Sequence, residues 1–470
     1  MSRKADLAKN TAILTVGKLC TQCISFFLLP LYTAMLSTAE YGTYDLLITY
    51  STLLLPLVNW QFDQGIFRFM LDFRQKKKKQ RKLFSTLLTS SFLQCIVYLV
   101  LFLIVKPFLT IPYVNFLLVY VILHVFTALL LQFVRGLGSN VKYTIASFIS
   151  ASSTTILNVI MLVGFKTGLL GLFVSTILSQ IITIIYLVIT TRCWNYFRVR
   201  YIDFSMIKVV GAYSLPLIPN NLAWWVVNAS DRIVIERFIN IAANGIYSVA
   251  NKFPSVFIQF FNVLNISWTE SVLLHFDDED RDEFFTETMT SFFKLFDSAC
   301  MGIIACMPFI FPILVDKKYN AAYNQIPILM YAMLFRVLVG LYSCIYVAQK
   351  KAKKIAATSI SAAVINLVVD LLLVHKIKVY AASVSTLVAF LSMFIFRYFD
   401  INKSIKMRIK PSIIIRSLGM GAINLFSYYL GSTLVKVLVL ILTVIYAALS
   451  NLDMVKSGYQ IVLKKFGISK

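Results

Sequence analysis

Clustered histidine, paired cysteine and phosphate-binding glycine loops are features that this 470-residue sequence lacks. Its three histidines, His124, His275 and His375, are too scattered to predict a metal site. Cys20 and Cys23 have the spacing of a redox or metal pair, but they lie one helical turn apart in an apolar run with no second pair nearby. We interpret them as small packing residues. No phosphate-binding glycine loop is present, which argues against ATP hydrolysis. We therefore expect no metal, no cofactor and no enzymatic activity.

The sequence is also poor in charge and rich in long apolar runs. Only 14% of the residues are charged, 59% are hydrophobic, and the mean hydropathy is +0.78. Stretches such as "FLQCIVYLVLFLIV" leave almost no polar face for water, which argues against a soluble helical protein. Apolar runs of about 20 residues, long enough to cross a bilayer, recur from end to end, whereas barrel strands would be about ten residues long with alternating polarity. We predict an all-α integral membrane protein.

Charged and turn residues divide the apolar runs into about fourteen transmembrane helices. The first run is about 25 residues long and follows a segment without the cleavage site of a secretory signal, so we expect it to be a retained span. The expected helices cover residues 11–35, 43–66, 83–105, 113–134, 144–165, 169–191, 207–230, 241–268, 285–314, 326–348, 355–375, 379–397, 413–431 and 434–450.

Lys and Arg are distributed unequally between the two sides of this predicted topology. Thirty of the 45 basic residues, Arg397 included, fall on the side of the N-terminus, and eight, Arg232 included, fall on the opposite side. Because cytoplasmic loops carry the excess of Lys and Arg, we predict that both termini face the cytoplasm. The net charge of +24 mostly reflects this topology, and "RQKKKKQRK" would face anionic headgroups. Membrane lipids are therefore expected partners, and nucleic acid is not.

Two similar stretches separated by six predicted helices indicate an internal repeat. "LSTAEYGTY" joins the first and second helices and "INIAANGIY" joins the seventh and eighth, so Gly42 corresponds to Gly245. Because six is even, each half starts on the same side of the membrane, and the halves should be related by a pseudo-two-fold axis along the membrane normal. We expect two six-helix bundles, residues 1–200 and 201–400, followed by two extra helices and a cytoplasmic tail in residues 401–470.

Three stretches of the sequence carry a family resemblance. They are "KNTAILTVGKLCTQCISFFLLPLYTAMLSTAEYGTYDLL", "FDQGIFRFM" and "YSLPLIPNNLAWWVVNASDRIVIERFINIAANGIYSVANKF". They resemble the polysaccharide repeat-unit (Wzx-type) flippases of the multidrug/oligosaccharidyl-lipid/polysaccharide exporter superfamily. The resemblance implies a bacterial plasma (inner) membrane protein that moves an undecaprenyl-pyrophosphate-linked oligosaccharide to the outer leaflet by alternating access, for O-antigen, capsule or exopolysaccharide synthesis. Other membrane proteins of polysaccharide assembly would then be partners.

Four basic residues lie deep in the expected spans: Lys18, Lys252, Lys294 and Arg336. Each would cost about 2.5 to 3.5 kcal/mol at a helix centre facing lipid, a cost that a water-filled cavity largely removes. Arg336 lies almost midway along its helix, which has no acidic residue, so we interpret it as a substrate-binding residue of the lumen. Lys294 precedes Asp297 by three residues, and an internal ion pair is as good an interpretation as a ligand site. For Lys18 and Lys252, the lumen and an interhelical hydrogen bond are equal alternatives.

Acidic residues are rarer in the spans. Asp45, Asp63 and Asp370 would either pair with these cations or bind a coupling proton or sodium ion, and the sequence leaves both open. Asp297 belongs with them as a coupling or ion-pair residue.

Proline marks the seventh expected helix as a candidate gate. Pro216 and Pro219 each remove an internal hydrogen bond and bend the helix. Asn220 and Asn221 follow them and are available to satisfy freed backbone groups or the hydroxyls of a sugar, so we assign both to the substrate site. A static kink is the equal alternative to a moving gate.

Two other functions are compatible with parts of this pattern. A drug/cation antiporter of the same superfamily would share the fold, but its cavity should be net acidic, whereas the deep charges here are mostly basic. An integral-membrane glycan polymerase would usually carry a large outer loop, and all the outer loops predicted here are short.

Overall fold

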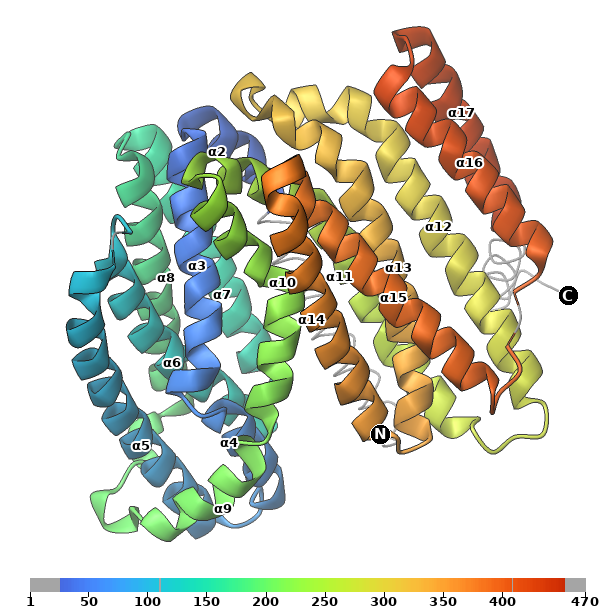
Figure 1. Ribbon diagram of the computed structural model, residues 1–470. Coiled ribbons are helices and arrows are strands. Elements are labelled where there is room, and N and C mark those ends of the chain that lie inside the picture. Colours follow the sequence, from blue (N-terminus) through green and yellow to red (C-terminus); the bar gives the residue numbers. More distant parts are fainter. Residues whose placement is uncertain (1–25, 110, 408, 453–470) are drawn as a thin grey trace, which may run out of the picture. The chain divides into compact units, whose positions relative to one another are not determined.

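The computed structural model describes residues 26–109, 111–407 and 409–452 (Figure 1). Within these ranges the chain forms sixteen α-helices, α2 to α17, and no β-strand. Ten helical segments there are both long and apolar enough to cross a bilayer. The predicted all-α membrane fold is therefore confirmed. Of the fourteen expected helices, eleven are continuous and two are interrupted, and most of the first lies outside the described residues, as does Lys18.

The chain divides into two compact units, Met1–Ser248 and Val249–Lys470. Helix α9 packs on α4 and α5, and α10 packs on α3, so both belong to the first unit. The division therefore lies inside α11, whereas the expected bundles divide at residue 200. The helices up to this division are α2 Leu29–Met35, α3 Thr38–Val58, α4 Phe62–Asp72, α5 Lys77–Val105, α6 Val114–Gly136, α7 Asn140–Val159, α8 Gly168–Thr191, α9 Phe204–Ser214, α10 Leu217–Phe238 and α11 Ile241–Leu274.

Short turns of helix complete the first unit. The second unit contains the longest candidate membrane span among the described residues, Arg281–Leu314. The turns are η1 Lys106–Phe108, the π turn η2 Ile160–Gly164, η3 Cys193–Asn195 and η4 Val199–Tyr201. The second unit contains α12 Arg281–Leu314, η5 Lys317–Gln325, α13 Ile326–Ala348, α14 Ala352–Ile377, α15 Tyr380–Asn402, α16 Pro411–Leu430 and α17 Thr433–Ser450.

Two expected spans are interrupted. The second breaks at residues 59–61, where Trp60 and Gln61 have positive φ angles of 52° and 58°, so α3 and α4 are separate helices. Such left-handed conformations are costly for residues other than glycine. The seventh breaks at Leu215 and Pro216, between α9 and α10, where proline removes a backbone donor. Residues 59–61 contain neither proline nor glycine, and the sequence signals this break only through Pro56, which predicts a kink three residues earlier.

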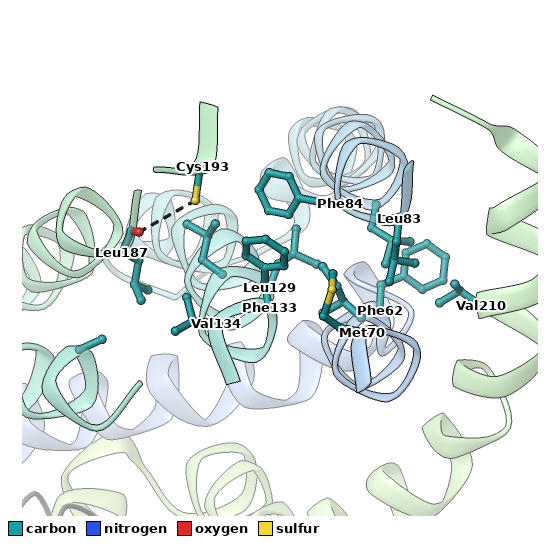
Figure 2. Close-up of a cluster of buried hydrophobic side chains, with 14 residues drawn as sticks. Phe62, Met70, Leu83, Phe84, Leu129, Phe133, Val134, Leu187, Cys193 and Val210 are labelled. Carbon is teal, nitrogen blue, oxygen red and sulfur yellow. Dashed lines mark hydrogen bonds between the residues drawn. The ribbon is translucent and has the colours of Figure 1, made fainter. Parts of the chain in front are cut away.

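The core of the first unit is aromatic and aliphatic. Figure 2 shows Phe84 of α5 and Phe133 of α6 facing each other, with ring centroids 4.2 Å apart. Phe62 and Met70 of α4 and Val210 of α9 fill the neighbouring space, and all five side chains are fully buried. Truncating one such phenylalanine to alanine typically costs about 3 to 5 kcal/mol. This core holds α4, α5, α6 and α9 together.

The two C-terminal helices are attached to α12 through a buried carboxylate. Asp297 of α12 accepts hydrogen bonds from the hydroxyl of Ser417 on α16, at 2.8 Å, and from that of Tyr446 on α17, at 2.9 Å. Both helices lie beside α12 in Figure 1. Both oxygens of Asp297 are therefore used to hold α16 and α17, and no ion pair with Lys294 is formed in the described structure.

Candidate functional site

Arg336 lies at the centre of the second unit's α13, as the eleventh of its 23 residues. Its guanidinium approaches the sulfur of Met333, at 3.9 Å, and lies over the ring of Phe390 on α15, 5.7 Å from the centroid. The side chain is only half-buried. A polarisable sulfur and an aromatic face are favourable contacts for a cation. Arg336 therefore lies, partly exposed, at the middle of a span.

Arg397 of α15 is fully buried, and this corrects its assignment to a loop. The prediction ended the helix at residue 397, whereas α15 continues to Asn402. Its Nε and Nη2 donate to the hydroxyl of Thr358 on α14, at 3.1 and 2.7 Å. Its Nη1 donates to the carbonyl of Val339, at 3.1 Å, and to the hydroxyl of Ser343, both on α13. One guanidinium therefore joins three helices.

A partly buried ion pair lies one turn beyond Arg397. Asp400 accepts from the ammonium of Lys354, at 2.7 Å, and from the hydroxyl of Tyr346, at 2.8 Å. The ring of Tyr346 in turn lies 5.8 Å from the Arg397 guanidinium. In the sequence, Asp400 follows Arg397 by three residues, and this spacing places both on one face of a helix. It is the signal that could have shown that the helix continues past Arg397. The arrangement fixes the ends of α13, α14 and α15 to one another.

The other predicted site residues of the second unit are placed on three different helices. Lys252 on α11 and Lys294 on α12 are half-buried, while Asp370 on α14 and Asp297 are buried. Neither Lys294 nor Asp297 forms an ion pair within 4.0 Å with another described residue. Their assignment to the lumen remains a prediction.

In the first unit, Asp45 pairs with Arg232, a cation that the sequence analysis placed in an outer loop. Arg232 lies inside α10, which continues to Phe238, and its Nε donates to the Asp45 carboxylate at 2.7 Å. The neighbouring Asp231 is buried and accepts from the hydroxyl of Tyr247 at 2.6 Å. The guanidinium of Arg232 lies 5.8 Å from the centre of that ring. These contacts connect α3, α10 and the start of α11.

The two glycines related by the sequence repeat pack against each other. A Cβ at Gly42 on α3 would overlap the carbonyl oxygen of Ile241 on α11, and one at Gly245 would overlap the carbonyl oxygen of Thr38 on α3. The side chain of Asn244 donates to the carbonyl of Gly42 at 2.9 Å. Only glycine permits this close approach of two backbones. The repeat therefore places equivalent small residues at one helix crossing.

Two of the remaining predicted residues of the first unit, Asn221 and Asp63, lie at the break between α3 and α4. Asn221 of α10 donates to the side chain of Gln61 at 2.8 Å, while Asn220 is exposed. Asp63 is buried and accepts from Asn59 at 3.0 Å and from Gln64 at 2.7 Å. The side chain of Asn59 also accepts from the backbone N–H of Gln61 at 2.8 Å, which satisfies one donor of the interrupted helix. Pro216 marks the break before α10, and Pro219 lies in its first turn.

A family model of polysaccharide biosynthesis proteins matches residues 7–268, more than half of the chain. The chain belongs to the polysaccharide biosynthesis protein family. Among curated proteins no sequence match is found.

The fold is also that of known members of the MOP superfamily. A solved structure of the lipid II flippase MurJ in an inward closed conformation matches with a TM-score of 0.73 at 12% identity, over 94% of this chain and 100% of that one. Inward-facing and outward-facing structures of a multidrug resistance MATE family transporter match with TM-scores of 0.69 and 0.58, both at 13% identity. They cover 81% and 84% of this chain, and 95% and 96% of those chains. The predicted resemblance is confirmed at the level of the fold.

Proposed function

We propose that this polysaccharide biosynthesis family member is a flippase of undecaprenyl-pyrophosphate-linked oligosaccharide repeat units. It would move them from the cytoplasmic to the outer leaflet of the bacterial plasma membrane, with both termini cytoplasmic. The observation that carries the proposal is the half-buried Arg336 at the centre of α13. An anionic pyrophosphate crossing the bilayer needs a compensating charge at mid-depth, where water is scarce. Family membership and the MurJ-like fold support the same assignment.

In this mechanism Arg336 attracts the pyrophosphate, and Lys18, Lys252 and Lys294 add positive charge along the path. Alternating access then exposes this path to each side of the membrane in turn, as two-bundle transporters do.

The Gly42–Gly245 crossing and the Asp45–Arg232 pair serve in this proposal as a seal on one side of the membrane. Tight backbone contact and a half-buried ion pair would close that side, and both must separate when it opens. The break at Pro216 supplies a hinge for α10, which carries Arg232.

A leaflet-sidedness assay of lipid-linked oligosaccharide tests the proposal directly. Cells with and without the chain are compared using an impermeant glycan-labelling probe on spheroplasts. We expect labelled lipid-linked oligosaccharide at the outer surface only when the chain is present, with the unflipped lipid accumulating inside when it is absent. Equal outer labelling in both strains would reject the function. An organic-cation efflux assay on the same strains tests the antiporter alternative, for which we expect no difference.

A further inference from the structure

A long apolar groove on the first unit lies outside the contacts described so far. It has a volume of about 690 Å³ and is lined by α3, α5 and α6, with Phe204 and Ile207 of α9 at one end. Along α5 its lining runs from Ser90 to Val105, which is about 22 Å of helix. The hydrocarbon core of a bilayer is about 30 Å thick, so the groove follows most of one crossing.

One polar side chain interrupts the apolar lining. Of the lining residues, only Ser90 and Gln94 are neither aliphatic nor aromatic. Gln94 is 7% exposed, and neither atom of its amide has a hydrogen-bond partner in the described part of the chain. A buried amide without a partner is unfavourable, and a chain with double bonds offers π faces to its N–H groups. A saturated chain offers none.

The end of the groove at Phe204 is strongly basic. Phe204 directly follows Asp203, whose carboxylate pairs with Lys82 of α5 and whose N–H donates to the hydroxyl of Thr86 at 3.0 Å. Lys82 lowers the pKa of Asp203 to about 2, so this carboxylate stays ionised and neutralises the charge of one cation, Lys82. The same segments, residues 81–90 and 193–208, contain no other acidic residue, and their other cations are Arg81, Arg198, Arg200 and Lys208. The surplus positive charge fits a phosphate.

We propose that this groove docks the polyprenyl chain of a phosphate-headed lipid, with the phosphate at the basic end and the chain along α5. The proposal rests on the proposed function, because that function supplies a lipid with this chemistry. The groove gives the hydrophobic tail a place on the first unit. It extends the substrate contacts from charged residues to an apolar surface of the chain.

Binding of undecaprenyl phosphate to the purified full chain in detergent, followed by native mass spectrometry, tests this site. Val97→Trp fills the groove from α5, where Val97 is 58% exposed. Val100→Trp is the matched control, on the same helix and 51% exposed but outside the lining. We expect the first variant to weaken binding about tenfold and the second to leave it unchanged. Equal binding by both variants would overturn the proposal.

Two further arms identify the ligand. The double variant Arg81→Gln with Arg200→Gln should weaken binding of undecaprenyl phosphate and not of uncharged undecaprenol; equal loss for both would reject the phosphate contact. Phosphatidylglycerol should compete poorly with undecaprenyl phosphate for the chain. If Val97→Trp weakens the binding of phosphatidylglycerol as strongly as that of undecaprenyl phosphate, the groove is a general lipid site and the polyprenyl assignment is rejected. If the wild-type chain flips glycan lipid but Val97→Trp binds normally, this inference fails and the proposed function stands.

Discussion

Arg336 and Arg397 lie on neighbouring helices of one unit and have opposite surroundings. Arg397 is fully buried and its guanidinium donates four hydrogen bonds to α13 and α14, whereas Arg336 is half-buried and lies against a sulfur and an aromatic ring. Hydrogen bonds to all sides of a guanidinium hold it in one geometry. The difference teaches that a cation in a span is assigned by its contacts and exposure: Arg397 joins helices, and for the partly exposed Arg336 we propose contact with a ligand.

The largest expected effect on stability is that of Arg397→Ala. It leaves Thr358 and Ser343 without their charged donor and opens a cavity between three helices, so we expect a loss of about 3 to 5 kcal/mol. Thermal unfolding in detergent measures it. Arg397→Lys, which keeps the charge and loses the fork, should fall between that variant and the wild type. An unchanged midpoint for Arg397→Ala would show that the buried guanidinium does not hold the unit together.

Thr358→Val removes the hydroxyl that accepts from two atoms of Arg397 and preserves the shape of the side chain. Losing hydrogen bonds to a charged group costs about 1.5 to 3 kcal/mol, so the unfolding midpoint should fall by less than for Arg397→Ala. Combining the two substitutions should cost less than their sum, because both remove the same contact. Strict additivity in this double-mutant cycle would contradict the assigned network.

Gly245→Ala tests the seal that we propose at the Gly42–Gly245 crossing of the first unit. The new methyl group overlaps the backbone of α3, and we expect a cost of about 1 to 3 kcal/mol together with impaired flipping. Gly302→Ala in α12, where no atom lies within 4 Å of the added Cβ, is the control and should change neither property. Flipping at the wild-type rate by Gly245→Ala would argue against a seal at this crossing.

The smallest expected stability effect among these is that of Lys354→Met. In its pair with Asp400 the lysine side chain is 43% exposed and the aspartate 14%, so water still screens the lysine, and pairs with such access to solvent contribute about 0 to 1 kcal/mol. The unfolding midpoint should hardly move, and high salt should have little further effect. A loss as large as that of Arg397→Ala would mean that the ion pair, rather than the buried guanidinium, fixes the three helix ends.

Much of the fold follows from hydrophobic length and turn residues. These patterns predict eleven of the described helices as continuous segments and the bend at Pro216, and the repeat identifies Gly42 and Gly245, which lie in contact, as equivalent. They missed the break at Trp60 and Gln61, because its polar neighbours, rather than a proline or glycine, satisfy the backbone there.

The candidate site was less predictable. Arg232 and Arg397 were counted as loop residues because charge was used to end helices, yet both helices continue past them and bury them with specific partners. The partners Asp45 and Thr358 lie 187 and 39 residues away in the sequence, so no local pattern reveals them. Arg336 was identified because its helix continues on both sides with no competing charge.

The measurement that tests the central claim most directly compares Arg336→Ala, Arg336→Lys and Arg397→Lys in the leaflet-sidedness assay, at equal amounts of folded protein. We predict that Arg336→Ala unfolds at the wild-type temperature and no longer delivers glycan lipid to the outer leaflet. Arg336→Lys should flip slowly because it keeps the charge without the bidentate fork. Arg397→Lys should flip normally per folded molecule. Wild-type flipping by Arg336→Ala would contradict the assignment of Arg336 to the substrate.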